Sequence, residues 1–385
     1  MLPIFGLLSF TSTFAQDTLK TYIFGHSLIN HELQVNQTPS QETSVPHWFH
    51  FLAEEDGNPY AVSGQYGFIP QHANLPPSAQ WVFDSVAPAW DSNNYPFSYP
   101  DFDNILITPG NFIQWQPPSV PYWQDTLSPL DYTNTIFDWV NQQEDSLILY
   151  VYENWPDMGG FLSQGFPPTS SEWTAYNNYL QGPFHDWFIE YHDSLIIAHP
   201  DHCVRMIPTG PVIGNLLMQS PFDQIAIDML YEDDAPHGRP TIYFLAALVT
   251  YMAMYETPAP DTYQVPVIID PIVANNYQQA VDFIWNELLN FNLLSGESRV
   301  FCSGSASLQD EDYIELQVYP NPTENQLEVL ADQPIKSLEF LDMSGRLLIV
   351  QSENKIDLSN FKTGTYHLKV IFENGQVVLK RVIKN

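Results

Sequence analysis

The chain has 385 residues, and its 45 acidic and 12 basic side chains give a formal net charge of −33 at pH 7. This length is enough for two domains and a sizeable core. So acidic a chain offers no basic patch to neutralise phosphates, which argues against a nucleic-acid partner. The longest apolar run, residues 241–255, is too short for a transmembrane segment and suits a buried helix.

The N-terminal segment, residues 1–15, is apolar and rich in small residues. It ends in Thr13-Phe14-Ala15, a sequence suited to cleavage after Ala15. These features predict a secretory signal peptide and therefore an exported protein.

Between residues 16 and 302, apolar runs typical of buried strands alternate with amphipathic stretches typical of helices. In chain order, we predict strands at 22–24, 60–62, 104–108, 146–152 and 203–207, and helices at 46–53, 133–143, 170–198, 240–255 and 277–291. The longest of these helices is interrupted near Gly182 and Pro183. Nearly continuous apolar strands favour a parallel arrangement buried on both faces. The pattern predicts a three-layer, flavodoxin-like α/β domain with a mostly parallel sheet.

A domain boundary is expected near residue 320, because the charge pattern changes there. Residues 320–385 contain eight acidic and eight basic side chains, so the first 319 residues carry the whole net charge of −33. Residues 303–315 are mostly polar or small and predict a linker. Beyond them, short alternating strands separated by turn residues predict an all-β, Ig-like sandwich over residues 316–385.

The chain contains two cysteines, Cys203 and Cys302. In an exported protein they could form one disulfide that closes the main domain. The alternative is a pair of buried free thiols, since Cys203 opens an apolar run that is typical of a strand.

Two short motifs carry the candidate chemistry. Gly25-His26-Ser27-Leu28 follows the first apolar strand, which places Ser27 on the turn at that strand's C-terminal end, where open α/β sheets bind ligands. Asp234-Ala235-Pro236-His237 puts a carboxylate three residues before a histidine, directly ahead of a long apolar helix. A nucleophilic serine needs a base to take its proton and a carboxylate to orient that base. Together the motifs supply all three groups.

The C-terminal segment closely resembles the sorting domain of the type IX secretion system of Bacteroidetes. The resemblance rests on five separated motifs in the expected order, at residues 318–323, 342–346, 356–358, 364–366 and 380–384. It implies a partner, the secretion machinery, and a secreted or cell-surface protein. It implies nothing about activity.

Residues 20 to about 295 resemble an SGNH (GDSL-type) hydrolase through the two motifs above, with His26 where the family has Asp. The resemblance implies that Ser27 is the nucleophile, His237 the general base, and Asp234 the residue that orients it. The expected oxyanion hole consists of the Ser27 N–H, the Gly67 N–H (with Gly64 as the alternative) and the Asn154 side chain. Asn154 is chosen because the family's G-x-N-D block is missing as such.

Several other residues have competing interpretations. His26, His47 and His50 could suggest a metal, but without a third ligand at a recognisable spacing packing roles are favoured. Asp101 and Asp103 could contribute to a calcium site, although an acidic loop is the default. Trp48, Trp115, Trp123 and Trp155 could form sugar-stacking platforms, but core or loop anchors are favoured.

The sequence thus predicts a secreted serine esterase that needs no cofactor and no metal. Its substrate would be a small acyl ester, and deacetylation of a carbohydrate is favoured by analogy with family and compartment. The alternative is a catalytically inactive surface module that binds a glycan or a partner in the same cleft.

Overall fold

The computed structural model describes residues 18–31, 40–110, 116–122, 125–144, 146–293, 295–302, 316–321, 323–331, 333–341, 347–372 and 377–384. The predicted signal peptide and linker lie outside these residues. The chain divides into two compact units, residues 1–306 and 307–385, and each is described by itself.

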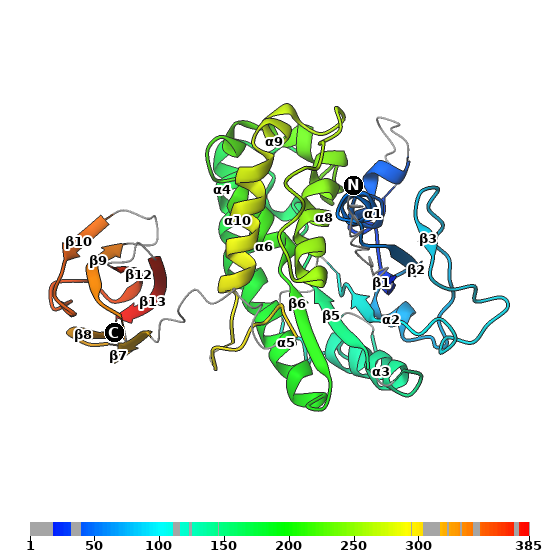
Figure 1. The fold of residues 1–385 in the computed structure, drawn as a ribbon, viewed down its shortest axis with the longest axis horizontal. Coiled ribbons are helices and arrows are strands. Elements are labelled where there is room, and N and C mark those ends of the chain that lie inside the picture. The colour runs from blue at the N-terminus through cyan, green and yellow to red at the C-terminus, as the bar shows by residue number, and fades with distance from the viewer. Residues whose placement is uncertain are drawn as a thin grey trace, which may run out of the picture. The chain divides into compact units, whose positions relative to one another are not determined.

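The main unit is built on a six-stranded parallel sheet (Figure 1). Its strand order is β3-β2-β1-β4-β5-β6. The strands are β1 (Leu19–Gly25), β2 (Tyr60–Tyr66), β3 (Ala87–Pro88), β4 (Asn104–Ile107), β5 (Ile148–Tyr152) and β6 (Cys203–Ile207). Apart from the two-residue edge strand β3, this is the flavodoxin-like order that was predicted, with the chain reversing direction across the sheet between β1 and β4.

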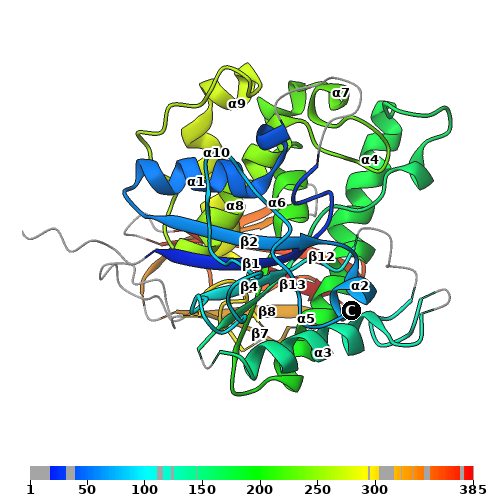
Figure 2. The same cartoon turned by 90° about the vertical axis from the view of Figure 1, so that its right-hand side faces the viewer.

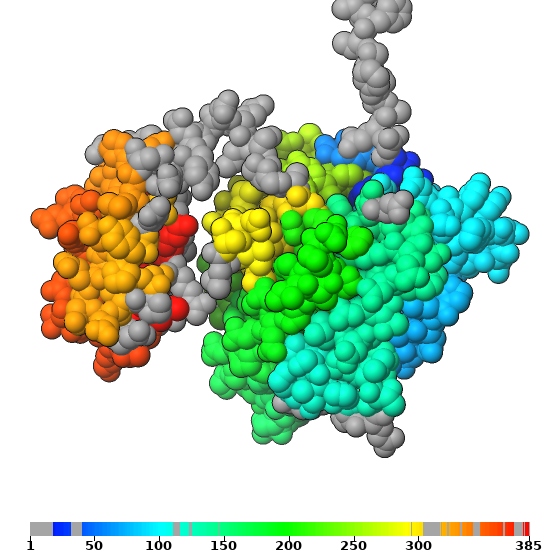
Figure 3. Space-filling model, turned by 90° about the horizontal axis from the view of Figure 1, so that it is seen from below, coloured from blue at the N-terminus to red at the C-terminus, as the bar shows by residue number. Residues whose placement is uncertain are grey.

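Helices cover both faces of this sheet, as the three-layer prediction requires. In Figure 2, α1, α8 and α10 lie on one side of the sheet and α3 and α5 on the other. The helices are α1 (Val45–Glu55), α2 (Ile69–His72), α3 (Pro129–Asn141), α4 (Ser170–Tyr179), α5 (His185–Ala198), α6 (Thr209–Leu216), α7 (Ile227–Leu230), α8 (Pro240–Tyr255), α9 (Pro271–Asn275) and α10 (Tyr277–Asn290). Side chains of α3 and α5 form part of the surface that faces the viewer in Figure 3.

Shorter helical turns are η1 (Ser40–Thr43), η2 (Gly159–Phe161), η3 (Leu180–Phe184) and η4 (Phe222–Gln224). The predicted interruption of the long helix is present, because η3 is a π-helical segment that contains Pro183 and a non-helical Gly182. A proline within a helix removes one backbone hydrogen bond, and this accounts for the break between α4 and α5.

Helix α8 forms the centre of one helical layer, and all of its residues except the last, Tyr255, are buried. It packs against α1, α6 and α10. A helix that is apolar on every side is stable only when neighbours cover all of its faces. The segment that precedes α8 carries His237, so this packing fixes the place where that segment ends.

The smaller unit has two antiparallel sheets, with strand orders β10-β9-β12-β13 and β11-β8-β7. The strands are β7 (Leu316–Tyr319), β8 (Gln326–Ala331), β9 (Ile335–Leu341), β10 (Leu347–Gln351), β11 (Lys355–Asp357), β12 (Gly364–Phe372) and β13 (Val377–Lys384). Alternate residues of the two sheets, including Leu327, Val329, Leu338 and Phe340, form one core. The predicted all-β class is confirmed, and β11 is a strand that the sequence pattern did not indicate.

Cys203 and Cys302 form a disulfide with a Cα–Cα distance of 6.0 Å, which confirms that alternative. Cys203 is the first residue of β6, and the bond closes a loop with a sequence separation of 99 residues. The cross-link holds the end of the main unit against an edge strand of the sheet.

We expect Cys302→Ser to lower the free energy of unfolding of the main unit by about 2–5 kcal/mol, because an open chain gains conformational entropy when it unfolds. All 10 tryptophans lie before residue 307, so tryptophan fluorescence during denaturant unfolding follows this unit alone. The wild-type protein in reductant serves as the control and should lose a similar amount. Equal stability of the oxidised wild type and the variant would contradict the prediction.

Candidate active site

Ser27 lies at the carboxyl end of the sheet, directly after β1. The Ile29 N–H donates to the His26 carbonyl at 2.9 Å, which closes a tight turn around Ser27. Glycine is required just before this turn, since a Cβ atom on Gly25 would lie 2.6 Å from the Trp81 ring. The strand therefore places a partly exposed serine at its carboxyl end, where the strand order switches between β1 and β4 and where open α/β sheets bind ligands.

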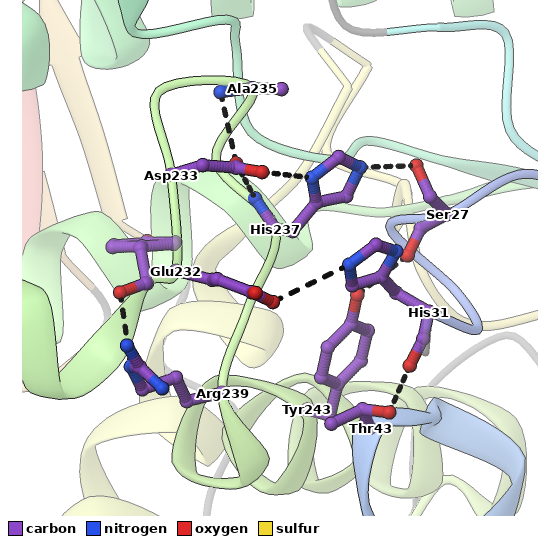
Figure 4. A network of polar contacts seen from close by, with 10 residues as sticks. Ser27, His31, Thr43, Glu232, Asp233, Ala235, His237, Arg239 and Tyr243 are labelled. Carbon is purple, nitrogen blue, oxygen red and sulfur yellow. Dashed lines mark hydrogen bonds and ion pairs between the residues drawn. The ribbon is translucent and has the colours of Figure 1, made fainter. Parts of the chain in front are cut away.

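His237 connects Ser27 to a carboxylate (Figure 4). Its Nε2 lies 2.9 Å from the Ser27 Oγ, and its Nδ1 lies 2.7 Å from the Asp233 Oδ2. Ser27 and His237 are 210 residues apart in the chain, and the predicted contact between them is present. With Nδ1–H donating to the carboxylate, the Nε2 lone pair faces the serine hydroxyl, which is the arrangement of a nucleophile and its general base.

The carboxylate that contacts the ring is Asp233, so the prediction of Asp234 is wrong. The Asp233 Oδ1 accepts the backbone N–H groups of Ala235 and His237, at 3.1 and 3.0 Å. This turn directs the other oxygen at the imidazole. Asp234 is oriented differently: its carboxylate lies 3.3 Å from where a Cβ on Gly159 would be. Adjacent residues in such a segment project to different sides, so the two carboxylates cannot share one role.

Asp233 remains ionised at neutral pH. Its partial burial favours the neutral acid, but hydrogen bonds from the His237 ring and backbone outweigh this and lower the pKa below its usual value of 3.8. An ionised carboxylate holds the histidine in the tautomer that leaves Nε2 as the acceptor.

Behind Ser27, a buried network anchors the turn through His26, which is only 1% exposed. The His26 Nδ1 accepts the Leu28 N–H at 3.3 Å, and its Nε2 lies 3.1 Å from the Thr108 Oγ1 and 3.1 Å from the Asn154 Nδ2. Burial, with nearby His72 and His237, lowers the pKa of His26 to about 3, so the ring is neutral. The network joins the turn to the ends of β4 and β5.

Two of the three predicted oxyanion donors are engaged elsewhere. The Gly67 N–H donates to the Gly25 carbonyl at 2.9 Å, because the β1–β2 pairing continues past the predicted strand end. The alternative, Gly64, lies within β2, where it is paired with Ile23 of β1 and is two residues short of the end of the strand. Asn154 is fully buried, and its amide belongs to the His26 network. These predictions are therefore wrong. In the described part of the chain the Ser27 N–H has no acceptor and is available to an anion.

Tyr243 is a residue of this site that sequence reasoning missed. It is fully buried on α8, and its hydroxyl donates to the Ser27 carbonyl at 2.6 Å. His31 and Glu232, which lie beside His237, were also missed. For Tyr243, its proximity to His237 in the sequence was a signal that could have been used. For His31 no such signal existed, because its packing depends on contacts between distant segments.

Two residues considered as metal ligands, His47 and Asp103, make packing or backbone contacts instead. His47 packs edge-on against the Trp48 and Phe51 rings, and the Asp103 carboxylate accepts the Lys20 N–H. Among the described residues, no group of three His, Cys, Asp or Glu side chains is placed to hold a metal ion. Likewise, no helix within the described ranges has the length and apolar character needed to span a membrane.

The four tryptophans considered as sugar platforms divide into two pairs. Trp48 and Trp155 are buried, and their indole N–H groups donate to the carbonyls of Glu42 and Pro236. These two anchor the core, as favoured. Trp115 and Trp123 lie outside the described residues.

Comparison with known families identifies the smaller unit. Residues 317–385 match the family model of the secretion system C-terminal sorting domain. This confirms the predicted sorting domain, and with it a protein that is exported to the cell surface or beyond. No curated protein matches the chain in sequence.

Among solved structures, the chain is similar to a DUF4886 family protein from Bacteroides uniformis (15% identity, 73% of this chain and 98% of that one, TM-score 0.45). It is also similar to a protein described as a GDSL-like lipase from Parabacteroides merdae (12%, 62% and 95%, TM-score 0.36). A third is a carbohydrate esterase family 2 enzyme with a carbohydrate-binding domain from Corynascus thermopiles (11%, 64% and 68%, TM-score 0.31). At these TM-scores, the likenesses carry no weight in assigning an activity.

The neutral, buried His26 predicts a pH dependence of stability. Unfolded, this histidine takes up a proton near pH 6.5, whereas the folded protein resists protonation until about pH 3. The unfolded state therefore binds more protons in this window, and the free energy of unfolding falls as the pH is lowered through it. We expect His26→Gln, which cannot titrate, to show a shallower fall between pH 6.5 and pH 4. Parallel curves for wild type and variant in denaturant titrations would contradict this.

Proposed function

We propose that the main unit is a serine esterase that acts outside the cell. The observation that carries the proposal is the unbroken series of contacts from the Asp233 carboxylate through His237 to the Ser27 hydroxyl, at 2.7 and 2.9 Å. A serine hydroxyl is a weak nucleophile unless a base removes its proton as it attacks. Here the base, its orienting carboxylate and the serine lie together beyond the carboxyl end of β1, the end of the strands at which open α/β sheets generally bind ligands.

In the proposed reaction, the Ser27 Oγ attacks the carbonyl carbon of the ester while its proton passes to the His237 Nε2. The Ser27 N–H, for which the described residues offer no acceptor, can donate a hydrogen bond to the substrate oxygen that becomes negatively charged. When the tetrahedral intermediate collapses, His237 returns the proton to the departing alcohol and Ser27 retains the acyl group. Water then attacks the acyl-enzyme, with His237 acting as base once more, and releases the carboxylic acid.

The substrate that we favour is an acylated carbohydrate, because an exported enzyme encounters acylated glycans at the cell surface. This choice rests on compartment and on the resemblance to SGNH hydrolases. A specific observation supports a second candidate, a binding module without activity. Both the Gly67 N–H and the Asn154 amide are engaged within the protein, so the oxyanion hole has fewer donors than the resemblance implies.

Ser27→Ala should abolish turnover of a short-chain aryl ester, because the variant lacks the nucleophile. The loss of a nucleophile of this kind is expected to lower kcat by about 10⁶-fold. Ser194→Ala is the matched control, since among the described residues the Ser194 hydroxyl bonds only to the Glu190 carbonyl within α5. Folding is compared by thermal unfolding. A wild-type protein that binds acylated polysaccharide yet hydrolyses no ester, and whose binding survives Ser27→Ala, would support the binding module.

The pair Asp233→Asn and Asp234→Asn tests which carboxylate orients His237. Asp233→Asn should lower kcat by about 10³–10⁴-fold, because an amide cannot hold the ring in the productive tautomer. Asp234→Asn removes a neighbouring charge of the same size and should change kcat only slightly. In steady-state kinetics, a larger loss of kcat in Asp234→Asn than in Asp233→Asn would contradict the role assigned to Asp233 and favour Asp234 as the orienting carboxylate.

A further inference from the structure

A second histidine lies flat against the proposed general base. The rings of His31 and His237 are stacked, with centroids 3.8 Å apart and an angle of 10° between their planes. The two side chains therefore share one face of contact, while the His237 edges point to Ser27 and Asp233 (Figure 4). Nothing in the relay of Asp233, His237 and Ser27 requires this second ring.

Backbone and side-chain contacts hold His31 in this position. Its N–H donates to the Thr43 carbonyl at 2.9 Å, and the Thr43 hydroxyl donates to the His31 carbonyl. The His31 Nε2 lies 3.6 Å from the Glu232 Oε2. The Glu232 side chain is only 2% exposed, and the His31 side chain is 11% exposed. The His31 ring is thus held against His237 by backbone hydrogen bonds and by a buried carboxylate beside it, and the stack is not a chance contact on the surface.

We propose that His31 is a positioning residue whose neutral ring supports the charged form of His237 during turnover, and that its protonation turns the site off at acidic pH. This inference rests on the proposed function. When Ser27 attacks, His237 gains the serine proton and becomes an imidazolium. A cation lying over an aromatic face within about 6 Å is stabilised by the electrons of that face. Once His31 itself carries a proton, the same geometry brings two like charges together.

The titratable groups that face His31 set the pH range of this effect. His237 lies against its face, and Glu232 and Asp233 come from the same loop as His237. Burial and the charge of His237 lower the pKa of His31, and the two carboxylates only partly offset this, so the pKa remains below 6.5. His31 is therefore neutral at pH 7, and the loss of activity is expected below pH 6.5.

The test compares an aromatic and an aliphatic replacement by the pH dependence of aryl ester hydrolysis in the full chain. His31→Leu should lower kcat at pH 7 by about 2- to 30-fold with little change in KM, because no π face remains to support the imidazolium. His31→Phe should retain most of kcat, because it keeps the face. It should also shift the acid limb of kcat to lower pH, since it cannot take up a proton.

His47 provides the matched control. It is also a buried histidine with a lowered pKa, but it packs against Trp48 and Phe51 on α1. His47→Phe and His47→Leu should leave kcat and its acid limb unchanged. Thermal unfolding identifies any variant that fails to fold. Equal kcat values and identical acid limbs for wild type, His31→Phe and His31→Leu would overturn the proposal, as would equal losses in both His31 variants.

Failure of the proposed function gives a different result, because the wild-type protein would then hydrolyse no ester, and the role of His31 in turnover would fall with it. A titration of histidine NMR signals tests the stack without relying on activity. The His31 midpoint should lie below pH 6.5 and rise in His237→Phe, where a phenyl ring that cannot carry a charge replaces the imidazole that lowers the His31 pKa. An unchanged His31 midpoint would contradict the coupling between the two rings.

Discussion

A hydrogen bond from the buried Tyr243 hydroxyl to the Ser27 carbonyl joins the two halves of the candidate site. Ser27 follows the first strand, whereas His237 precedes α8, and nothing in the local sequence brings these segments together. Because α8 is buried on all sides, the tyrosine cannot move without disturbing the core. The bond therefore transmits the rigidity of the helical layer to the turn that carries the serine.

Two groups of the site differ in charge because their surroundings differ. His26, directly before Ser27, is enclosed and neutral, while Asp233 is partly exposed and hydrogen-bonded, so it remains charged. The neutral ring accepts the Leu28 N–H at Nδ1, and its Nε2 lies against Thr108 and Asn154, without placing a charge behind the serine. The charged group lies instead at the far end of His237, where a carboxylate stabilises the imidazolium that forms during the reaction.

Strongly patterned segments made much of the fold predictable, but the finer parts of the site depend on contacts that no local pattern encodes. Ser27 and His237 border long apolar elements, and their positions followed from those elements. Asp233 and Asp234 are adjacent carboxylates, and backbone hydrogen bonds within the turn decide between them. Gly67 was misassigned because β2 extends to Tyr66, so the ladder takes up its N–H. His31 and His237 are far apart in the sequence, and only the folded structure brings their rings together.

The central claim is that Ser27 is an activated nucleophile, and covalent trapping tests it most directly. The full chain is incubated with a fluorophosphonate, which reacts with activated serine hydroxyls, and the site of the adduct is mapped by mass spectrometry of peptides. The account predicts one adduct per chain, located on Ser27, with its formation much slower in Asp233→Asn. Absence of any adduct from folded wild-type protein, or an adduct on another serine alone, would contradict it.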